Sequence, residues 1–280
     1  TIFSPQNISA MRVINALLSS VLIITILISC KKDDEPPEDP CTKGNGEIVQ
    51  NEINLQMNFV GFRNFTSANV LFNEDDDQSV LIQSQQNIID LFEISMDQDE
   101  FLNIRLAEET CLSESVVVTI TITSPSLGTI SNNGSGEIEV GKFTDESEVV
   151  LNCTDIGSIN FRDKIEGLSS VNAEILGDGN ITSNLDSDEY FIRNSGAGAF
   201  TANPSTAMNT VIINSGSGVT DTRNLESEFC NVSSSGSGDC FVRCTNELTI
   251  NLAGSGNVTY FGNPILFSSV TGTGQIIKGD

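Results

Sequence analysis

The chain of 280 residues contains no histidine. Because Ser-His-Asp and Cys-His mechanisms need an imidazole base, this absence excludes both kinds of catalytic site. The chain also lacks a pair of C-x-x-C motifs, which together with the missing histidine argues against zinc. An EF-hand loop and the calcium β-roll signature G-G-x-G-x-D are absent too. We therefore expect no metal centre and no cofactor, although the Asp75-Asp76-Asp77 run is the best local candidate for a weak cation contact.

Basic residues are scarce. Thirteen Lys and Arg oppose 38 Asp and Glu, which gives a net charge of −25. This balance argues against nucleic acid as a partner and against direct docking on anionic lipid. Glycoside hydrolysis needs two carboxylates at a fixed separation, but among so many acidic residues no motif selects a pair. We therefore expect no enzymatic activity, and the alternative is a polysaccharide-active enzyme built on the same fold.

Long apolar runs are missing as well, apart from Ala16 to Ile28, which follows Met11 and Arg12. This run is shorter than a transmembrane span normally requires and is typical of a secretory signal. We predict an upstream extension at 1–10 and a signal peptide at 11–29. Leu27-Ile28-Ser29-Cys30 resembles a bacterial lipobox. The resemblance implies cleavage after Ser29, lipidation of Cys30 and anchoring to the outer membrane, whereas the alternative is an ordinary signal peptide with a chance cysteine.

Residues 30–46 are rich in charge and proline, which prevents a packed core and predicts a solvated tether. A lysine followed by acidic residues directly after Cys30 resembles the export signal of surface-exposed lipoproteins in Bacteroidetes-type bacteria. The resemblance implies display at the cell surface. A plain spacer, which would leave the protein as a periplasmic structural or accessory lipoprotein, explains the same residues.

A short glycine motif recurs through the second half of the chain and organises the rest of it. Its first positions are 134, 155, 177, 196, 216, 236, 254 and 272, where Asp155-Ile156-Gly157 is a degenerate copy. The steps of 18 to 22 residues match one coil of a β-solenoid. Glycine tolerates positive φ at no steric cost, so each G-x-G predicts a tight turn between two short strands.

Apolar residues stand at fixed offsets from these turns. The second residue after each full motif forms one column: Ile138, Ile181, Phe200, Thr220, Cys240, Val258 and Ile276. Upstream, Leu248, Ile250 and Leu252 alternate with polar residues, the period of a half-buried strand. A flexible Gly/Ser linker does not carry β-branched residues in this way. We predict an all-β, right-handed parallel β-helix, or solenoid, with G-x-G turns over 126–280.

Residues 47–125 read as strands without the glycine period and with no helical periodicity. Asn69 to Phe72 and Val80 to Ile82 flank the acidic run, which predicts a hairpin. Leu102 to Leu106 alternates, and Val116 to Ile122 is β-branched. We interpret this part as irregular first coils or as an irregular N-terminal β cap over the open end of the solenoid.

A family resemblance rests on three features taken together. These are the strand that ends in Ser124-Pro125-Ser126-Leu127, the Gly-Ser-Gly coils after it, and the closing stretch Gly254 to Pro264. The pattern resembles the family named putative auto-transporter adhesin, head GIN domain, over about 54–280. The resemblance implies an extracytoplasmic protein, usually a lipoprotein, with a β-helix-like fold. It implies no catalytic residues, and the adhesin role is itself an inference for that family.

Two arginines are the candidate ligand contacts. Arg223 and Arg243 both stand seven residues after a motif's first glycine, as does Arg162 in the degenerate coil. Stacked coils are about 5 Å apart, so an acidic glycan or a carboxylate between the two guanidinium groups is one reading. The other is that both groups splay toward neighbouring acidic residues. The partner, whether a surface, a glycan or a protein, is left open.

Six cysteines follow Cys30, an even number that permits disulfides in an exported protein: Cys41, Cys111, Cys153, Cys230, Cys240 and Cys244. Cys153, Cys230 and Cys240 fall in columns that we predict to face inward, so buried free thiols are equally consistent. Cys240 and Cys244 are close enough in sequence for a local bridge. The pairing stays open.

Overall fold

A computed structural model describes residues 40–280, apart from 56–57 and 145–146. The predicted signal peptide and the lipidation site Cys30 lie outside the described residues. No helix in the described part is long and apolar enough to cross a membrane. The elements are β1 (Ile48–Ile53), β2 (Gly61–Asn64), β3 (Asn69–Glu74), β4 (Ser79–Gln85), α2 (Gln86–Ile89), β5 (Phe92–Met96), β6 (Phe101–Leu106), β7 (Thr119–Ser124), β8 (Thr129–Asn132), β9 (Glu137–Val140), β10 (Glu148–Cys153), β11 (Ser158–Phe161), β12 (Ile165–Ile175), β13 (Asn180–Ser183), β14 (Leu185–Asn194), β15 (Phe200–Ala202), β16 (Ser205–Asn214), β17 (Thr220–Ser234), β18 (Cys240–Leu252), β19 (Val258–Phe261), β20 (Ile265–Val270) and β21 (Ile276–Lys278).

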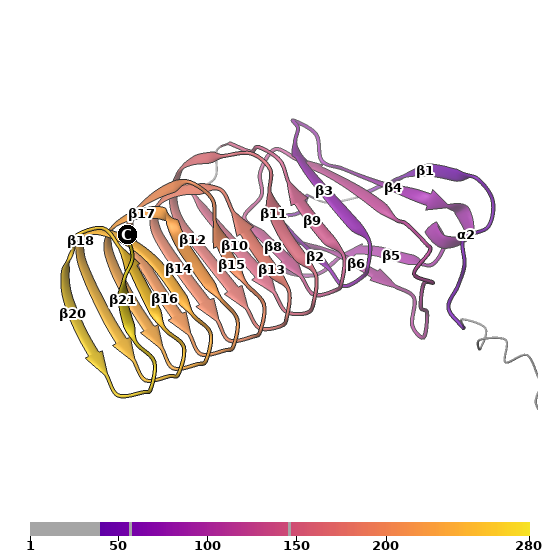
Figure 1. The fold of residues 1–280 in the computed structure, drawn as a ribbon. Helices are drawn as coiled ribbons and strands as arrows, with labels where there is room; N and C mark the ends of the chain where they lie inside the picture. Colours follow the sequence, from indigo (N-terminus) through magenta and orange to yellow (C-terminus); the bar gives the residue numbers. More distant parts are fainter. Residues whose placement is uncertain (1–39, 56–57, 145–146) are drawn as a thin grey trace, which may run out of the picture. The chain divides into compact units, whose positions relative to one another are not determined.

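The strands from β8 onward form a parallel β-solenoid, as predicted (Figure 1). Two long faces run along the stacked coils. Face A consists of β8, β10, β12, β14, β16, the second halves of β17 and β18, and β20. Face B consists of β9, β11, β13, β15, the first residues of β17 and β18, and then β19 and β21. Each glycine turn connects face A to face B within one coil.

The predicted inward columns are confirmed by the register. Ile138 pairs with Ile159, which in turn pairs with Ile181, and the same alignment continues from coil to coil as far as Ile276. Ile138 and Val258 are fully buried. Stacking of equivalent apolar residues from neighbouring coils supplies the core that a single coil cannot make for itself. The degenerate copy is part of this stack, because Ile159 lies between Ile138 and Ile181.

The predicted glycine turns are also confirmed, but the physical reason given for them is wrong. None of the motif glycines lies in the left-handed region of φ. A Cβ on Gly218 would instead overlap the carbonyl oxygen of Gly198, the equivalent glycine one coil earlier. That approach is close because the N–H groups of Ser217 and Gly218 both donate to the Gly196 carbonyl oxygen, at 3.0 Å each. Glycine is required here by the stacking distance between coils.

Buried asparagines hold several turns from inside the solenoid. The amide nitrogen of Asn132 donates to the Gly136 carbonyl oxygen at 2.7 Å, and Asn194 and Asn214 repeat this bond to Gly198 and Gly218. All three asparagines are 0% exposed. Their side chains supply hydrogen-bond donors to carbonyl groups inside the solenoid, where water cannot do so. The interior of the solenoid is therefore not uniformly apolar.

The first coil comes from β2 and β3, which pair with β8 and β9 on one side and with β6 and β7 on the other. Its turn carries Thr66 and Ala68 where the next coil has Gly134 and Gly136. Side chains are tolerated here because no glycine turn precedes them. The sequence of this region is consistent with either coils or a cap, and the structure contains both.

The cap consists of antiparallel pairs at the end where the chain enters (Figure 1). β4 pairs with β1 and β7, and β5 pairs with β6. The hairpin predicted between β3 and β4 is wrong. Both strands pair with β7, which lies between them, so the acidic connection at 75–78 passes over the end of β7. The β-branched strand β7 therefore pairs with both β3 and β4. A turn signal between β3 and β4 cannot reveal that a third strand lies between them.

Candidate functional site

Arg223 and Arg243 lie on consecutive coils at the edge of face B. Thr222 pairs with Val242, but the register shifts after this pair, so that Arg243 pairs with Glu226 on the preceding coil and with Phe261 on the next one. The Arg223 Nε donates to Asp221 Oδ1 at 2.9 Å, and its guanidinium carbon lies 4.2 Å from the centroid of the Phe241 ring. Arg223 therefore turns toward a neighbouring acidic residue, as one of the two readings of the sequence expects.

Arg243 behaves differently. Its Nε donates to the carbonyl oxygen of Arg223 at 2.7 Å, and its guanidinium carbon lies 5.6 Å from the centroid of Phe261. Among the described residues, no carboxylate lies within 4.0 Å of Arg243. Its two terminal nitrogens are left without a protein partner in that part of the chain. A half-buried guanidinium fork of this kind matches the geometry of a carboxylate.

Arg162, the third arginine at this offset, is occupied. Its Nη2 donates to Asn73 Oδ1 at 2.8 Å, across Gly141 of the coil between them. Its Nε lies 4.0 Å from Glu139 Oε2. We therefore define the arginine edge as Arg223, Arg243 and the rings of Phe241 and Phe261, without Arg162.

Face A carries two hollows that sequence analysis did not find. They have volumes of about 360 Å³ and about 210 Å³, and Asn172 and Phe191 line both of them. The first extends toward Glu148, Glu189 and Asn209, and the second toward Asn152, Glu174 and Arg193. We call this region the Phe191 face. It crosses β10, β12, β14 and β16.

The Phe191 face contains a half-exposed ring, Phe191, and two polar pairs beside it. Asn172 Nδ2 donates to Glu148 Oε1 at 2.9 Å, and Arg193 Nε lies 3.6 Å from Glu174 Oε1. Amides and carboxylates around an aromatic ring can pair with hydroxyl groups while the ring contacts an apolar C–H surface. One sequence signal existed: Phe191 is a large ring at an outward position, between the buried Tyr190 and Ile192. The outward position of Phe191 could be recognised only when the strand register showed which residues of β14 point into the core.

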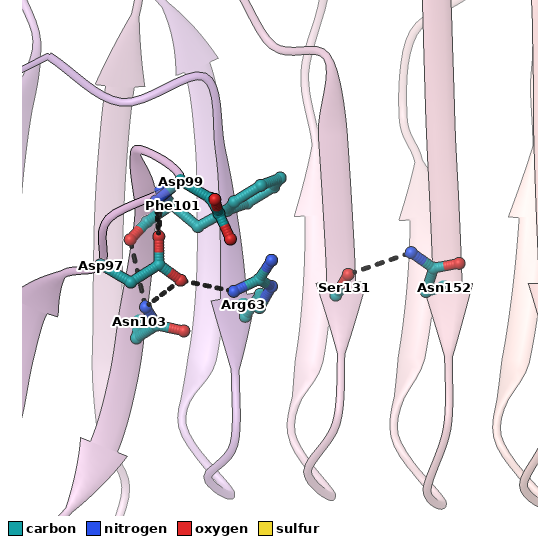
Figure 2. A network of polar contacts seen from close by, with 7 residues as sticks. All are labelled: Arg63, Asp97, Asp99, Phe101, Asn103, Ser131 and Asn152. Atoms are coloured by element: carbon teal, nitrogen blue, oxygen red, sulfur yellow. Dashed lines mark hydrogen bonds and ion pairs between the residues drawn. The ribbon is translucent and has the colours of Figure 1, made fainter.

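A polar network surrounds Asp97 at the cap end of the solenoid (Figure 2). Asp97 Oδ2 accepts from Arg63 Nη1 at 2.6 Å and from Asn103 Nδ2 at 3.1 Å. Asp97 Oδ1 accepts from the backbone N–H groups of Phe101 and Asp99. The N–H of Phe101, then the amide of Asn103, lower the pKa of the Asp97 carboxyl. Because these groups are committed to one another, we assign the network a structural role.

A third hollow, of about 360 Å³, lies on the short side that connects face B to face A. Asp186, Asp188 and Glu228 line it. Asp186 is already bound to Lys164 Nζ at 2.8 Å and to the N–H of Thr206 at 2.8 Å. In the described residues, no group of three His, Cys, Asp or Glu side chains is arranged to hold a metal ion.

The six cysteines in the described part of the chain form one disulfide and four buried thiols. Cys41 and Cys111 form the disulfide, next to a bridge between Thr42 and Leu112 that ties the entering chain to the cap. Burial raises the pKa of the Cys153 and Cys240 thiols to about 11. The thiols of Cys230 and Cys244 complete the set of free cysteines.

Comparison with solved structures identifies the same fold in bacterial proteins. A putative adhesin from Parabacteroides distasonis aligns with a TM-score of 0.76 at 19% identity, over 85% of this chain and 99% of that one. A second putative adhesin, from Parabacteroides merdae, aligns with a TM-score of 0.75 at 16% identity and the same coverage. A putative lipid binding protein from Parabacteroides distasonis aligns with a TM-score of 0.74 at 22% identity, again over 85% and 99%.

At these identities the likeness establishes the fold alone. No curated protein matches the chain. A family model does match, over residues 58–264, which is most of the chain. The match covers the first coil, the cap strands β4 to β7, and the coils as far as β19. The chain belongs to the family of the putative auto-transporter adhesin, head GIN domain.

Proposed function

We propose that the protein is a non-enzymatic attachment module that binds a glycan on the outer surface of its coils. Membership of an adhesin family supports a binding role. The observation that carries the proposal is the Phe191 face, where two hollows meet at a half-exposed aromatic ring bordered by amides and carboxylates. Sugars present hydroxyl groups at their edges and C–H groups on their faces, and both kinds of group find partners here.

The arginine edge supports a second, acidic contact. In a chain of net charge −25, the half-buried guanidinium of Arg243 has no carboxylate within 4.0 Å among the described residues. A carboxylate on the ligand would supply that charge. The two contacts lie on different faces, so they are separate sites, and Arg243→Gln tests the second one independently.

The binding experiment uses the purified full chain on a glycan array, followed by calorimetry with the best hit. Phe191→Ala and Asn172→Ala are expected to weaken binding at least about tenfold, or about 1.4 kcal/mol, because both residues line both hollows. Phe229→Ala is the matched control, an outward and 42% exposed ring on face A outside these two hollows. Equal affinities in all variants would reject the Phe191 face.

The same ligand also distinguishes a binder from a polysaccharide-active enzyme. We expect no release of reducing ends or unsaturated sugars on prolonged incubation with it. Turnover that disappears when Glu148 or Glu174 is replaced by Gln would contradict the non-enzymatic proposal and favour the alternative.

We further propose that Cys30 is lipidated and that the module is displayed on the outer surface of the outer membrane. The lipobox-like residues 27–30 and the charged tether after them support this location. Protease treatment of intact cells should remove the coils, whereas Cys30→Ala should release the protein from the membrane fraction. Protection of the coils until the outer membrane is opened would exclude surface adhesion and favour a periplasmic accessory role.

A further inference from the structure

Cys230 and Cys244 lie against each other at the corner between consecutive coils. Cys244 pairs in register with Ser227, three residues before Cys230. The contacts of the two thiols cross over between the strands. Cys230 Sγ contacts the Arg243 carbonyl oxygen at 3.7 Å, and Cys244 Sγ lies 3.3 Å from the Glu228 carbonyl oxygen and 3.0 Å from that of Glu247. Each thiol therefore reaches the backbone within two residues of the other cysteine.

The two thiols are not equivalent. The neighbouring Cys230 thiol, and then the backbone of Asn246 and Glu247, lower the pKa of Cys244. The neighbouring Cys244 thiol, together with burial, raises the pKa of Cys230. Because the thiolate is the nucleophile in disulfide exchange, Cys244 is the attacking group and Cys230 the resolving one.

We propose that Cys230 and Cys244 form a dithiol–disulfide pair that cross-links β17 to β18. The oxidant is a disulfide-bearing carrier of the exported compartment. The Cys244 thiolate attacks one sulfur of the carrier, breaks its S–S bond and forms a mixed disulfide, while the carrier's other sulfur leaves as a thiolate. Cys230 then loses its proton and attacks the Cys244 sulfur, which releases the second carrier thiolate. One protein disulfide forms, the carrier is reduced to two thiols, and these take up the two protons.

The rest of the chain supports oxidation at this pair in particular. The Cys41–Cys111 disulfide shows that the fold accommodates an oxidised bridge, as expected of an exported protein. Cys153 and Cys240 instead contact a backbone carbonyl and an asparagine amide, respectively, and neither has a thiol neighbour among the described residues. They are internal controls, buried to the same degree as the pair.

Oxidation of this pair would also affect Arg243 in the arginine edge. The S–H group of Cys230 points at the carbonyl of Arg243, whose own Nε is bound to the carbonyl of Arg223. Disulfide formation removes that S–H donor and fixes the backbone next to Arg243 by a covalent bond. The redox state of the pair thus sets the position of Arg243, whether or not a glycan binds there.

The test is peptide mapping by mass spectrometry of the full chain after titration with oxidised glutathione, with free thiols alkylated under denaturing conditions. Trypsin cuts after Arg223 and Arg243, so Cys230 and Cys244 fall in different peptides. In Cys240→Ala, which leaves Cys230 as the only cysteine of its peptide, we expect the two peptides to be cross-linked and Cys153 to be alkylated. Cys230→Ala should abolish the cross-link, and Cys153→Ala should retain it.

A second measurement does not depend on the folding of any variant. In the wild-type chain, oxidised glutathione should protect Cys230 and Cys244, but not Cys153 and Cys240, from alkylation and should raise the midpoint of thermal unfolding. Alkylation of both Cys230 and Cys244 at the end of the titration, or a cross-link that joins Cys240 to Cys244 instead, would overturn the proposal.

Discussion

Arg63 on the first coil and Asp97 in the turn between β5 and β6 form an ion pair, with 2.6 Å between Nη1 and Oδ2 (Figure 2). The guanidinium carbon of Arg63 also lies 3.8 Å from the centroid of the Phe101 ring. The pair therefore joins the cap hairpin to the stack of coils. Each side chain is about one-third exposed, so the pair is partly screened by solvent.

Asp97 makes the stability of the cap dependent on pH. Its pKa is lowered below the ordinary value of an aspartate, so its contribution to stability is present above about pH 4 and is lost as pH falls through the folded-state pKa. Asp97→Asn should reduce the urea midpoint at pH 7 and flatten its dependence between pH 2 and pH 5. Asp76→Asn, in the exposed acidic connection, is the control. Parallel acid profiles for wild type and Asp97→Asn would contradict this assignment.

Substitution of a motif glycine should disturb the stacking of coils. In Gly218→Ala the new Cβ would overlap the carbonyl oxygen of Gly198, and the backbone must move apart. We expect a loss of about 3 kcal/mol or more in the free energy of unfolding, measured by urea titration. Ser217→Ala changes the exposed middle residue of the same turn and should cost less than about 0.5 kcal/mol. Similar losses for the two variants would disprove the steric explanation.

The contribution of the buried asparagines to the free energy of unfolding should also be measurable. Asn132→Ala removes bonds to the carbonyl oxygens of Gly136, at 2.7 Å, and Ser158, at 3.0 Å. Because the Gly136 carbonyl oxygen keeps only the longer bond from the Ser158 N–H, at 3.2 Å, we expect a loss of about 1–2 kcal/mol. Asn251→Ala, on an exposed outward position of β18, is the matched control and should be close to neutral. Hydrogen exchange at Gly136 and its neighbours would show whether the turn itself loosens.

The Cys41–Cys111 disulfide closes a long loop across the cap. With a sequence separation of 70, its removal should cost about 4 kcal/mol in the chain-entropy account. Cys111→Ser and the double variant Cys41→Ser/Cys111→Ser lose the same bond, so their urea midpoints should agree. A double variant within about 1 kcal/mol of the wild type would mean that the strand pairs of the cap hold the entering chain without it.

The repeat period and the inward columns could be read from the chain alone, because apolar residues recur at fixed offsets from each turn. Ile138, Ile181 and Phe200 are in register as predicted. The bounds of the first coil could not be predicted, and a cap remained an equal interpretation, because its turn carries Thr66 and Ala68 and glycine was the only turn signal available. The exchange of partners at β7 was equally hidden, since strand order depends on contacts between segments that are distant in the sequence.

The sequence by itself determined that this chain folds as stacked coils of 18 to 22 residues, because each coil must bury its apolar side chains against equivalent ones. It also determined the family pattern. Only the tertiary structure decided why the turns need glycine, since the obstacle is a carbonyl oxygen one coil away. It likewise decided which cysteines meet and which outward side chains surround Phe191. Those neighbours come from different coils, and their contacts depend on exact register and on side-chain direction.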